Sequence, residues 1–225
     1  MENLELVNIK EQFLKNGYCQ FPVKLLDVEF YELLHKNYLC NETKNLKHLI
    51  REVRFDSEEF KTKYKDNDFN KLDTEKEKLY NQYKDVERSI SQMWFMNNDN
   101  KELPFKDKIE SGLDKIVKFL YDLDETTKIT HPELQLTYYN KHCRFESHVD
   151  GMTADGIICS ILIYLNENYK KEHGGLLVFN DELIVPEFGI CALMDMTKHQ
   201  IKHGVTEVTD GNGRFAILSF PKLEH

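Results

Sequence analysis

From Leu134 onward the chain is a series of short apolar runs separated by turn residues, and this rhythm constrains the fold more than any other feature. The runs are rich in β-branched and aromatic residues, and they cover residues 134–139, 157–165, 176–179, 183–185, 190–194, 205–208 and 215–220. Glycine, asparagine, aspartate and proline lie between them, as is typical of tight turns. Short strands at close spacing predict an antiparallel sandwich or jelly roll, whose open end can hold a small ligand.

The first 130 residues have a different, mainly helical pattern. Apolar residues at helical spacing predict helices over 3–16 and 27–39, and a third from Pro104 to about Tyr121. Residues 18–22 predict a short strand that ends at a proline. These helices have no evident core of their own, so we expect them to pack on the sheet that follows.

The middle of the chain is less informative. A capping-box pattern at 74–77 precedes a helical repeat of apolar side chains, which predicts one more amphipathic helix with a buried stripe (Leu79, Tyr83, Val86, Ile90 and Met93). Residues 41–73 predict loops and short helices, either a substrate-facing insertion or a solvated surface stretch. The expected fold class is α+β, one integrated domain with a helical buttress (1–130) and a jelly-roll core (131–225).

Composition excludes several classes of protein. The net charge is −9 and the pI about 5.5, which argues against nucleic acid held through its phosphates. Five cysteines, an odd number without CxxC spacing, favour reduced thiols over a disulfide framework. No signal peptide and no apolar run of membrane-spanning length is evident. We expect a soluble cytoplasmic protein with no membrane partner; its oligomeric state stays open.

Three side chains form a candidate metal site. Alternate residues of a strand share a face, so His148 and Asp150 point the same way if their segment is extended. His203, from a distant segment, is the candidate third ligand. Two histidines and one carboxylate leave adjacent positions open, as in non-haem Fe(II) oxygenases, whereas a structural zinc site would need a fourth protein ligand.

Arg214 is the candidate partner of a keto-acid cosubstrate. A 2-oxo acid can bind a metal through its carboxylate and keto oxygen, and its far carboxylate then needs a cation. Guanidinium binds carboxylate bidentately and stays charged. Taken singly, an HxD pair, a histidine or an arginine is more often a structural or surface residue. Their combination in this order, on predicted strands, is much more specific.

The segment resembles the Fe(II)/2-oxoglutarate dioxygenases, most closely the prolyl 4-hydroxylase and hypoxia-factor prolyl hydroxylase branch. The matching residues are Tyr138, His148-Val149-Asp150, Tyr164-Leu165-Asn166, Gly174-Gly175-Leu176-Leu177-Val178-Phe179, Pro186 with Gly189, His203-Gly204-Val205 with Val208, and Gly213-Arg214-Phe215. The resemblance implies a double-stranded β-helix, the distorted jelly roll. It implies a catalytic Fe(II) held by His148, Asp150 and His203.

The same resemblance implies the cosubstrates and their contacts. 2-Oxoglutarate would be anchored by Arg214 with hydroxyl help from Tyr138 and Tyr164. Leu177 and Val205 would be apolar walls of that pocket. O2 is the oxidant, and ascorbate is a supporting reductant. Halogenases of this fold lack the metal-binding carboxylate, so its presence here favours hydroxylation.

Three functions remain open from the sequence. The first is a hydroxylase of a protein or peptide, with proline as the target residue. The second is a small-molecule oxygenase with the same metal site, and the third is a non-catalytic jelly-roll binding module. The loops 41–73, 96–104 and 151–156 would decide between the first two, because a wide groove favours a peptide and a closed pocket a metabolite.

Overall fold

The computed structural model describes most of the chain. It covers residues 4–38, 50–54, 88–94, 105–132, 134–139, 141, 143–150, 156–179, 182–199, 201–209 and 213–224, with the backbone alone for 50–54, 88–94 and Tyr138.

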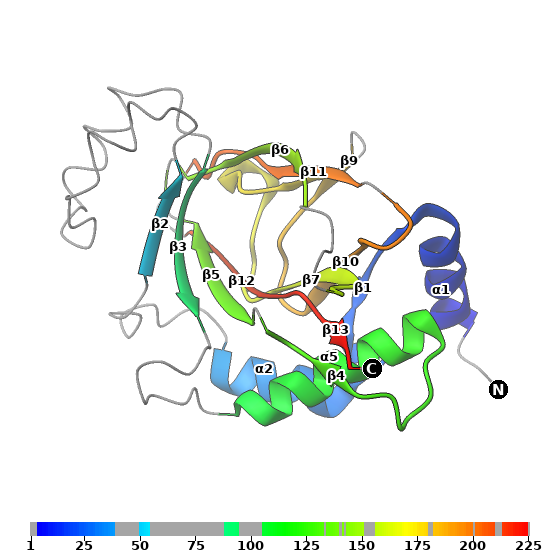
Figure 1. Cartoon of the computed structure of the whole chain (residues 1–225). Coiled ribbons are helices and arrows are strands. Elements are labelled where there is room, and N and C mark those ends of the chain that lie inside the picture. Colours follow the sequence, from blue (N-terminus) through cyan, green and yellow to red (C-terminus); the bar gives the residue numbers. More distant parts are fainter. Residues whose placement is uncertain are drawn as a thin grey trace.

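One long antiparallel sheet curls on itself to form two facing layers (Figure 1). The larger layer consists of β1 (Tyr18–Pro22), β10 (Ile190–Asp195), β7 (Cys159–Tyr164), β12 (Arg214–Ser219), β5 (Gln135–Tyr139) and β3 (Arg88–Trp94), with β2 (Ile50–Arg54) paired to β3. The smaller layer consists of β6 (Phe145–Val149), β11 (Lys202–Val205), β8 (Leu177–Phe179) and β9 (Glu182–Ile184). Strand β3 joins the layers, because it pairs with β5 and, through one bridge, with β6.

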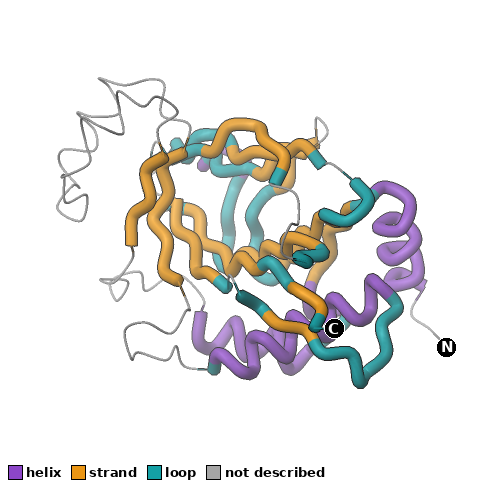
Figure 2. Tube along the Cα trace, viewed as in Figure 1, coloured by secondary structure: helices purple, strands orange, loops and turns teal. Residues whose placement is uncertain are grey.

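Three helices lie against the outer face of the larger layer (Figure 2). They are α1 (Leu4–Asn16), α2 (Val28–Tyr38) and α5 (Lys106–Tyr121), and the short 3₁₀ helices are η1 (Val23–Leu25) and η4 (Lys171–His173). A two-stranded ribbon of β4 (Ile129–Thr130) and β13 (Lys222–Leu223) closes the chain. None of the described helices is long and apolar enough to span a membrane.

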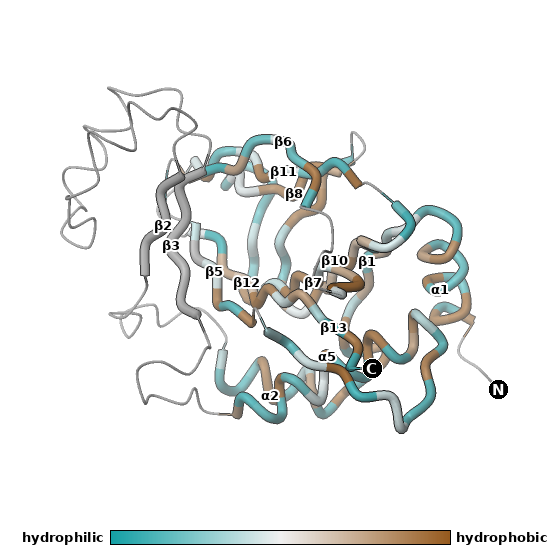
Figure 3. The backbone as a smooth tube through the Cα atoms, viewed as in Figure 1, coloured by the Kyte–Doolittle hydropathy of each residue, from teal (hydrophilic) through white to brown (hydrophobic). Residues whose placement is uncertain are grey.

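Strand β7 shows why a continuous apolar run was needed. All six of its residues are buried, because the larger layer is covered on both faces. Cys159, Ile161 and Ile163 join the core shared with the helices, while Leu162 and Tyr164 join the core between the two layers. Figure 3 shows hydrophobic residues along β7, β12 and α5.

Helix α5 confirms the spacing read from the sequence. Its predicted apolar stripe is completely buried against the sheet (Ile109, Leu113, Ile116, Val117 and Leu120). Helix α2 begins after Asp27, whose Oδ1 accepts the Phe30 backbone N–H at 2.9 Å and so caps the helix. Gly17 follows α1 with a positive φ of 76°, a conformation that glycine adopts readily at the end of a helix.

The fold class is confirmed, but two local predictions are wrong. Residues 88–94 are strand β3 and not the end of a helix, since backbone pairing with β2 and β5 overrides the helical spacing of the apolar residues. The strand expected at 205–208 instead spans 202–205, where it pairs with β6 and β8. Residues 50–54, inside the expected loop segment 41–73, form β2; most of the predicted helix and of that segment lies outside the described residues. The boundary at residue 130 stays a prediction.

Candidate metal centre

Two neighbouring strands of the smaller layer bring the predicted ligands together. His148 on β6 lies opposite His203 on β11, and Asp150 follows β6 directly. The ligand atoms of these three residues all lie within 4.8 Å of one another. His148 Nε2 is 3.2 Å from Asp150 Oδ1, and His203 Nε2 is 3.5 Å from Asp150 Oδ2. We call this group the triad.

The hydrogen bonds of the two imidazoles fix which nitrogens face the carboxylate. Nδ1 of His148 donates to the Glu146 carbonyl at 2.9 Å, and Nδ1 of His203 donates to the Ile201 carbonyl at 3.1 Å. A neutral imidazole with its proton on Nδ1 has a lone pair on Nε2. Both Nε2 lone pairs then converge on the carboxylate oxygens, and electron-rich atoms facing one another are stabilised by a shared cation.

Burial and charge together keep the triad able to bind a metal. Burial raises the pKa of Asp150, but its hydrogen bond with His148 and the charges of both histidines lower it, so the net pKa lies below its ordinary value. Burial lowers the pKa of His203. Each shift favours the deprotonated form of its own group, the form that coordinates metal. The lowering at Asp150 comes from histidines that carry protons, and a bound cation would take the place of those protons.

A glycine allows the two ligand-bearing strands to approach. A Cβ at position 204 would lie 2.9 Å from the Phe145 carbonyl oxygen and 3.1 Å from the Ser147 backbone. The register between β11 and β6 also shifts between His203 and Val205. Gly204 thus permits the close pairing that sets the two imidazoles side by side, with ring centroids 4.4 Å apart.

Arg214 lies inside the sandwich with little to neutralise it. Its side chain is 1% exposed, and its Cζ is 4.8 Å from the centre of the Tyr139 ring and 5.0 Å from that of Tyr164. Nη2 reaches the Tyr164 hydroxyl at 3.5 Å, and Nε has no hydrogen-bond partner among the described residues. No described carboxylate pairs with it either. A buried guanidinium in this state is expected to bind an anionic ligand, because an unpaired buried charge is costly.

Asn166 holds the backbone on both sides of this arginine. Its amide nitrogen donates to the Gly213 carbonyl at 3.0 Å, and its amide oxygen accepts the Phe215 N–H at 2.7 Å. Asn166 was noticed in the sequence only as part of a matching motif. Its clamping contact depends on two segments that meet only in the folded chain.

The other predicted cosubstrate residues occupy distinct places. Leu177 and Val205 are register partners on β8 and β11, and both are buried. The Tyr138 side chain is outside the described structure, so its contact stays a prediction. In the backbone register Tyr138 lies opposite Phe215, whereas Tyr139 lies opposite Arg214. Sequence reasoning missed Tyr139, because only the strand register shows which tyrosine shares the arginine's position.

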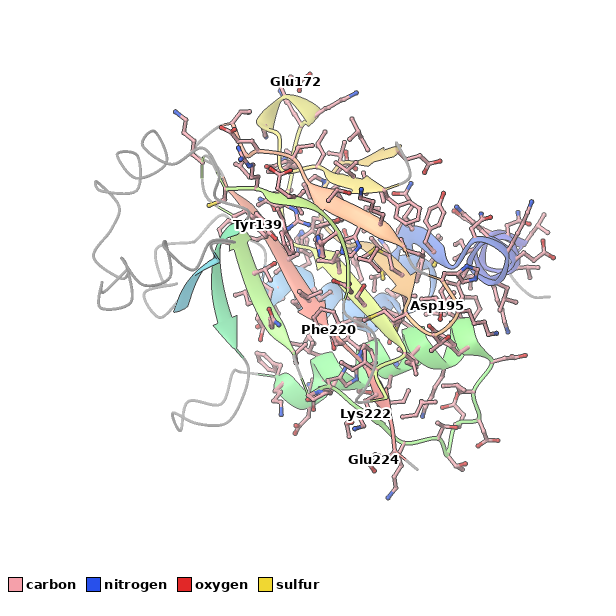
Figure 4. The ribbon with its side chains drawn as sticks, turned by 45° about the horizontal axis from the view of Figure 1, so that its top comes forward. Tyr139, Glu172, Asp195, Phe220, Lys222 and Glu224 are labelled. Carbon is pink, nitrogen blue, oxygen red and sulfur yellow. The ribbon has the colours of Figure 1, made fainter. Side chains whose placement is uncertain are left out.

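A pocket of about 130 Å³ adjoins the triad. Its lining residues are Val149, Asp150, Met194, Asp195, Met196, Thr197, Lys198, His199, Ile201 and His203. Tyr139, at the end of β5 and in contact with Arg214, and Asp195, at the end of β10, both belong to the larger layer and lie well apart in it (Figure 4). The triad therefore has an open side that is separate from the arginine.

Comparison with known proteins agrees with this geometry. Residues 134–221 match the family model described as the 2OG-Fe(II) oxygenase superfamily. No protein with a curated description matches the chain by sequence.

Solved structures share the fold at low identity. A Pseudomonas putida prolyl-4-hydroxylase superposes with a TM-score of 0.62 at 16% identity, covering 98% of each chain. A Trichoplax adhaerens prolyl hydroxylase, solved with a hypoxia-inducible factor peptide fragment, has a TM-score of 0.56 at 14% identity, covering 97% of this chain and 88% of that one. An α-ketoglutarate-dependent epimerase of nogalamycin biosynthesis has a TM-score of 0.55 at 10% identity, covering 96% and 82%.

These matches favour an oxygenase over the alternative of a non-catalytic jelly-roll module. The double-stranded β-helix expected from the sequence is the core of such oxygenases, and the triad lies within the matched segment. Residues 134–221 thus match the 2OG-Fe(II) oxygenase superfamily, whose dioxygenases use Fe(II), 2-oxoglutarate and O2, and the chain resembles the prolyl 4-hydroxylases in fold.

Proposed function

We propose that this dioxygenase hydroxylates a prolyl residue of a peptide or protein, with His148, Asp150 and His203 as the iron ligands. The observation that supports the ligand assignment is the convergence of two Nε2 atoms on one carboxylate, with both Nδ1 atoms hydrogen-bonded to backbone carbonyls. Two imidazoles and a carboxylate are the donor set of non-haem Fe(II) oxygenases.

The residues around the triad have separate roles. Arg214 pairs with the far carboxylate of 2-oxoglutarate, and the Tyr164 hydroxyl, 3.5 Å from Nη2 of Arg214, shares that contact. Leu177 and Val205 exclude water from the keto acid. When bound, Fe(II) with 2-oxoglutarate and O2 supplies oxidation of an unactivated C–H bond, coupled to release of succinate and CO2. The protein contributes orientation and electrostatics.

A peptide substrate is supported by the two prolyl hydroxylase structures of similar fold, one of them solved with a peptide. A small-molecule substrate is the second candidate. It is favoured by the size of the pocket beside the triad, about 130 Å³, and by the fold likeness to the epimerase. Both candidates place the target carbon on the open side of the triad.

The test separates metal function from substrate choice. Protein loaded without oxygen with Fe(II) and 2-oxoglutarate is exposed to O2, and succinate is measured without added substrate. We expect slow, iron-dependent succinate release, which His203→Ala and Asp150→Ala abolish. Iron-independent release, or release unchanged in both variants, would refute the ligand assignment.

Substrate class is tested separately by mass spectrometry. Proline-containing peptides and free small molecules are incubated with the loaded enzyme, and products are searched for one added oxygen atom. Hydroxylation confined to small molecules would replace the peptide proposal with the second candidate.

A further inference from the structure

The pocket beside the triad is lined by a lysine, Lys198, that lies apart from the predicted cosubstrate residues. We propose that this pocket binds a carboxylate of the substrate close to the hydroxylated carbon, with Lys198 as its counter-charge. The inference rests on the proposed function, because it assigns the pocket to the substrate that this site oxidises.

The pocket and the cosubstrate residues lie on different sides of the triad. Asp150 and His203 line the pocket, but Arg214, Tyr164 and Leu177 do not. Its volume of about 130 Å³ is that of roughly four liquid water molecules. One side chain or one small molecule fits there, next to the metal ligands, and this is where a target carbon has to lie.

The carboxylate of Asp195 is already hydrogen-bonded to Tyr121 and to its own turn. Its Oδ1 accepts the Tyr121 hydroxyl at 2.8 Å and both the hydroxyl and the N–H of Thr197, at 2.7 and 3.3 Å. Its Oδ2 accepts the Lys198 backbone N–H at 2.8 Å. Burial raises the pKa of Asp195, but these hydrogen bonds lower it by more. The net pKa lies below its ordinary value, and the group stays ionised. Its carboxylate fixes the turn that carries Lys198.

Lys198 is an exposed residue that lines the pocket. Among the described residues no carboxylate forms an ion pair with it. His199, the next residue, is fixed by packing: a Cβ on Gly17 would lie 2.3 Å from its Cγ. The turn is therefore held from both sides and presents a cation at the pocket. Asp150 offers no lasting partner, because its charge is used by the metal in the loaded enzyme.

The remaining lining residues define the shape of the expected group. Val149, Met194, Met196 and Ile201 are apolar. An aliphatic segment fits against them, and an adjacent carboxylate fits the lysine. A prolyl peptide with a neighbouring acidic residue has this chemistry, and so does a small cyclic amino acid with a free carboxylate.

The experiment measures binding and so does not depend on turnover. The probes are blocked prolyl peptides of equal length with Glu, Gln or Lys beside the proline, together with N-acetylproline and N-acetylprolinamide. Each is titrated by calorimetry into protein loaded with Mn(II) and 2-oxoglutarate. We expect the Glu peptide or N-acetylproline to bind about fivefold more tightly than its neutral counterpart. This factor corresponds to ~1 kcal/mol, the free energy of a solvent-accessible ion pair. Preference in the peptide series or in the small-acid pair identifies the source of the carboxylate.

Variants assign the preference to one side chain. Lys198→Met removes it and Lys198→Glu reverses it, while Lys36→Glu, the same charge change on the exposed face of α2, leaves it unchanged. The preference also weakens as ionic strength rises. Equal binding of acidic and neutral probes, no binding by any probe, or a preference that survives Lys198→Met overturns the proposal. Iron-dependent succinate release, measured in parallel, shows whether the oxygenase site itself functions.

Discussion

Replacing Arg214 with methionine distinguishes a cosubstrate anchor from a structural arginine. The side chain is 1% exposed, and its Nε has no hydrogen-bond partner among the described residues. A charge-assisted pair whose one partner is truncated loses about 2–5 kcal/mol. At 1.4 kcal/mol per factor of ten, 2-oxoglutarate affinity should fall by about 30-fold to several thousand-fold.

Without ligand the same change should cost little stability. Removing an unpaired buried charge is favourable, whereas the contacts with the Tyr139 and Tyr164 rings are lost. We expect the free energy of unfolding to stay within about 2 kcal/mol of the unmodified protein. A structural arginine would show the opposite pattern, with a large loss of stability and unchanged ligand affinity.

The assay is thermal unfolding in Mn(II) at increasing 2-oxoglutarate concentrations. At one hundred times its Kd, a ligand stabilises by about 2.7 kcal/mol, which for a chain of this size raises Tm by roughly 5–10 °C. At that concentration the rise should fall to about a third or less for Arg214→Met, since a 30-fold loss of affinity leaves about 0.9 kcal/mol of stabilisation. Arg144→Met, which removes an arginine that pairs with Glu146 at 2.9 Å, is the matched control and should keep it. An equal rise for Arg214→Met and the unmodified protein would refute the anchor.

Three further predictions concern the ligands, the strand pairing and a helix cap. His203→Ala should abolish the Tm increase of about 5–10 °C that Mn(II) at one hundred times its Kd produces, with far-ultraviolet circular dichroism unchanged. Gly204→Ala should weaken Mn(II) binding about tenfold, because the added Cβ would lie 2.9 Å from the Phe145 carbonyl oxygen and separate β6 from β11; unchanged affinity in calorimetry would contradict this. Asp27→Ala should lower the free energy of unfolding by about 1–2 kcal/mol in urea titrations. Burial raises the pKa of Asp27, but its hydrogen bonds with Lys115 and the Phe30 N–H lower it, and the net pKa is below 3.8. The stabilisation by this carboxylate is thus complete above about pH 4 and is lost as pH falls through the folded-state pKa, so the difference between variant and parent should shrink there.

The elements with strong periodicity were predictable from the sequence. Helix α5 needs one apolar face to cover the sheet, and strand β7 needs apolar residues on both faces because it is covered on both. Both elements lie where the sequence predicts them. Strand β3 was missed, because its apolar residues also fit a helical period. Only its hydrogen bonds to β2 and β5 decide between the two conformations.

The candidate site divides in the same way. Side-chain chemistry and spacing alone predict His148, Asp150 and His203 as ligands and Arg214 as an anchor. The place of Tyr139, the clamp made by Asn166 and the cation at Lys198 were not predictable. Each depends on the register or packing of segments far apart in the chain.

The sequence by itself determined which side chains can coordinate iron, because residue type is a property of the chain. It also determined that short strands would carry them, because the local hydrophobic period can be read along the chain. Tertiary structure decided which of these groups meet. Strand register aligned His148 with His203 and Tyr139 with Arg214, and burial left the arginine without a carboxylate partner among the described residues. The physical reason is that register and desolvation depend on contacts between distant segments, which no local pattern contains.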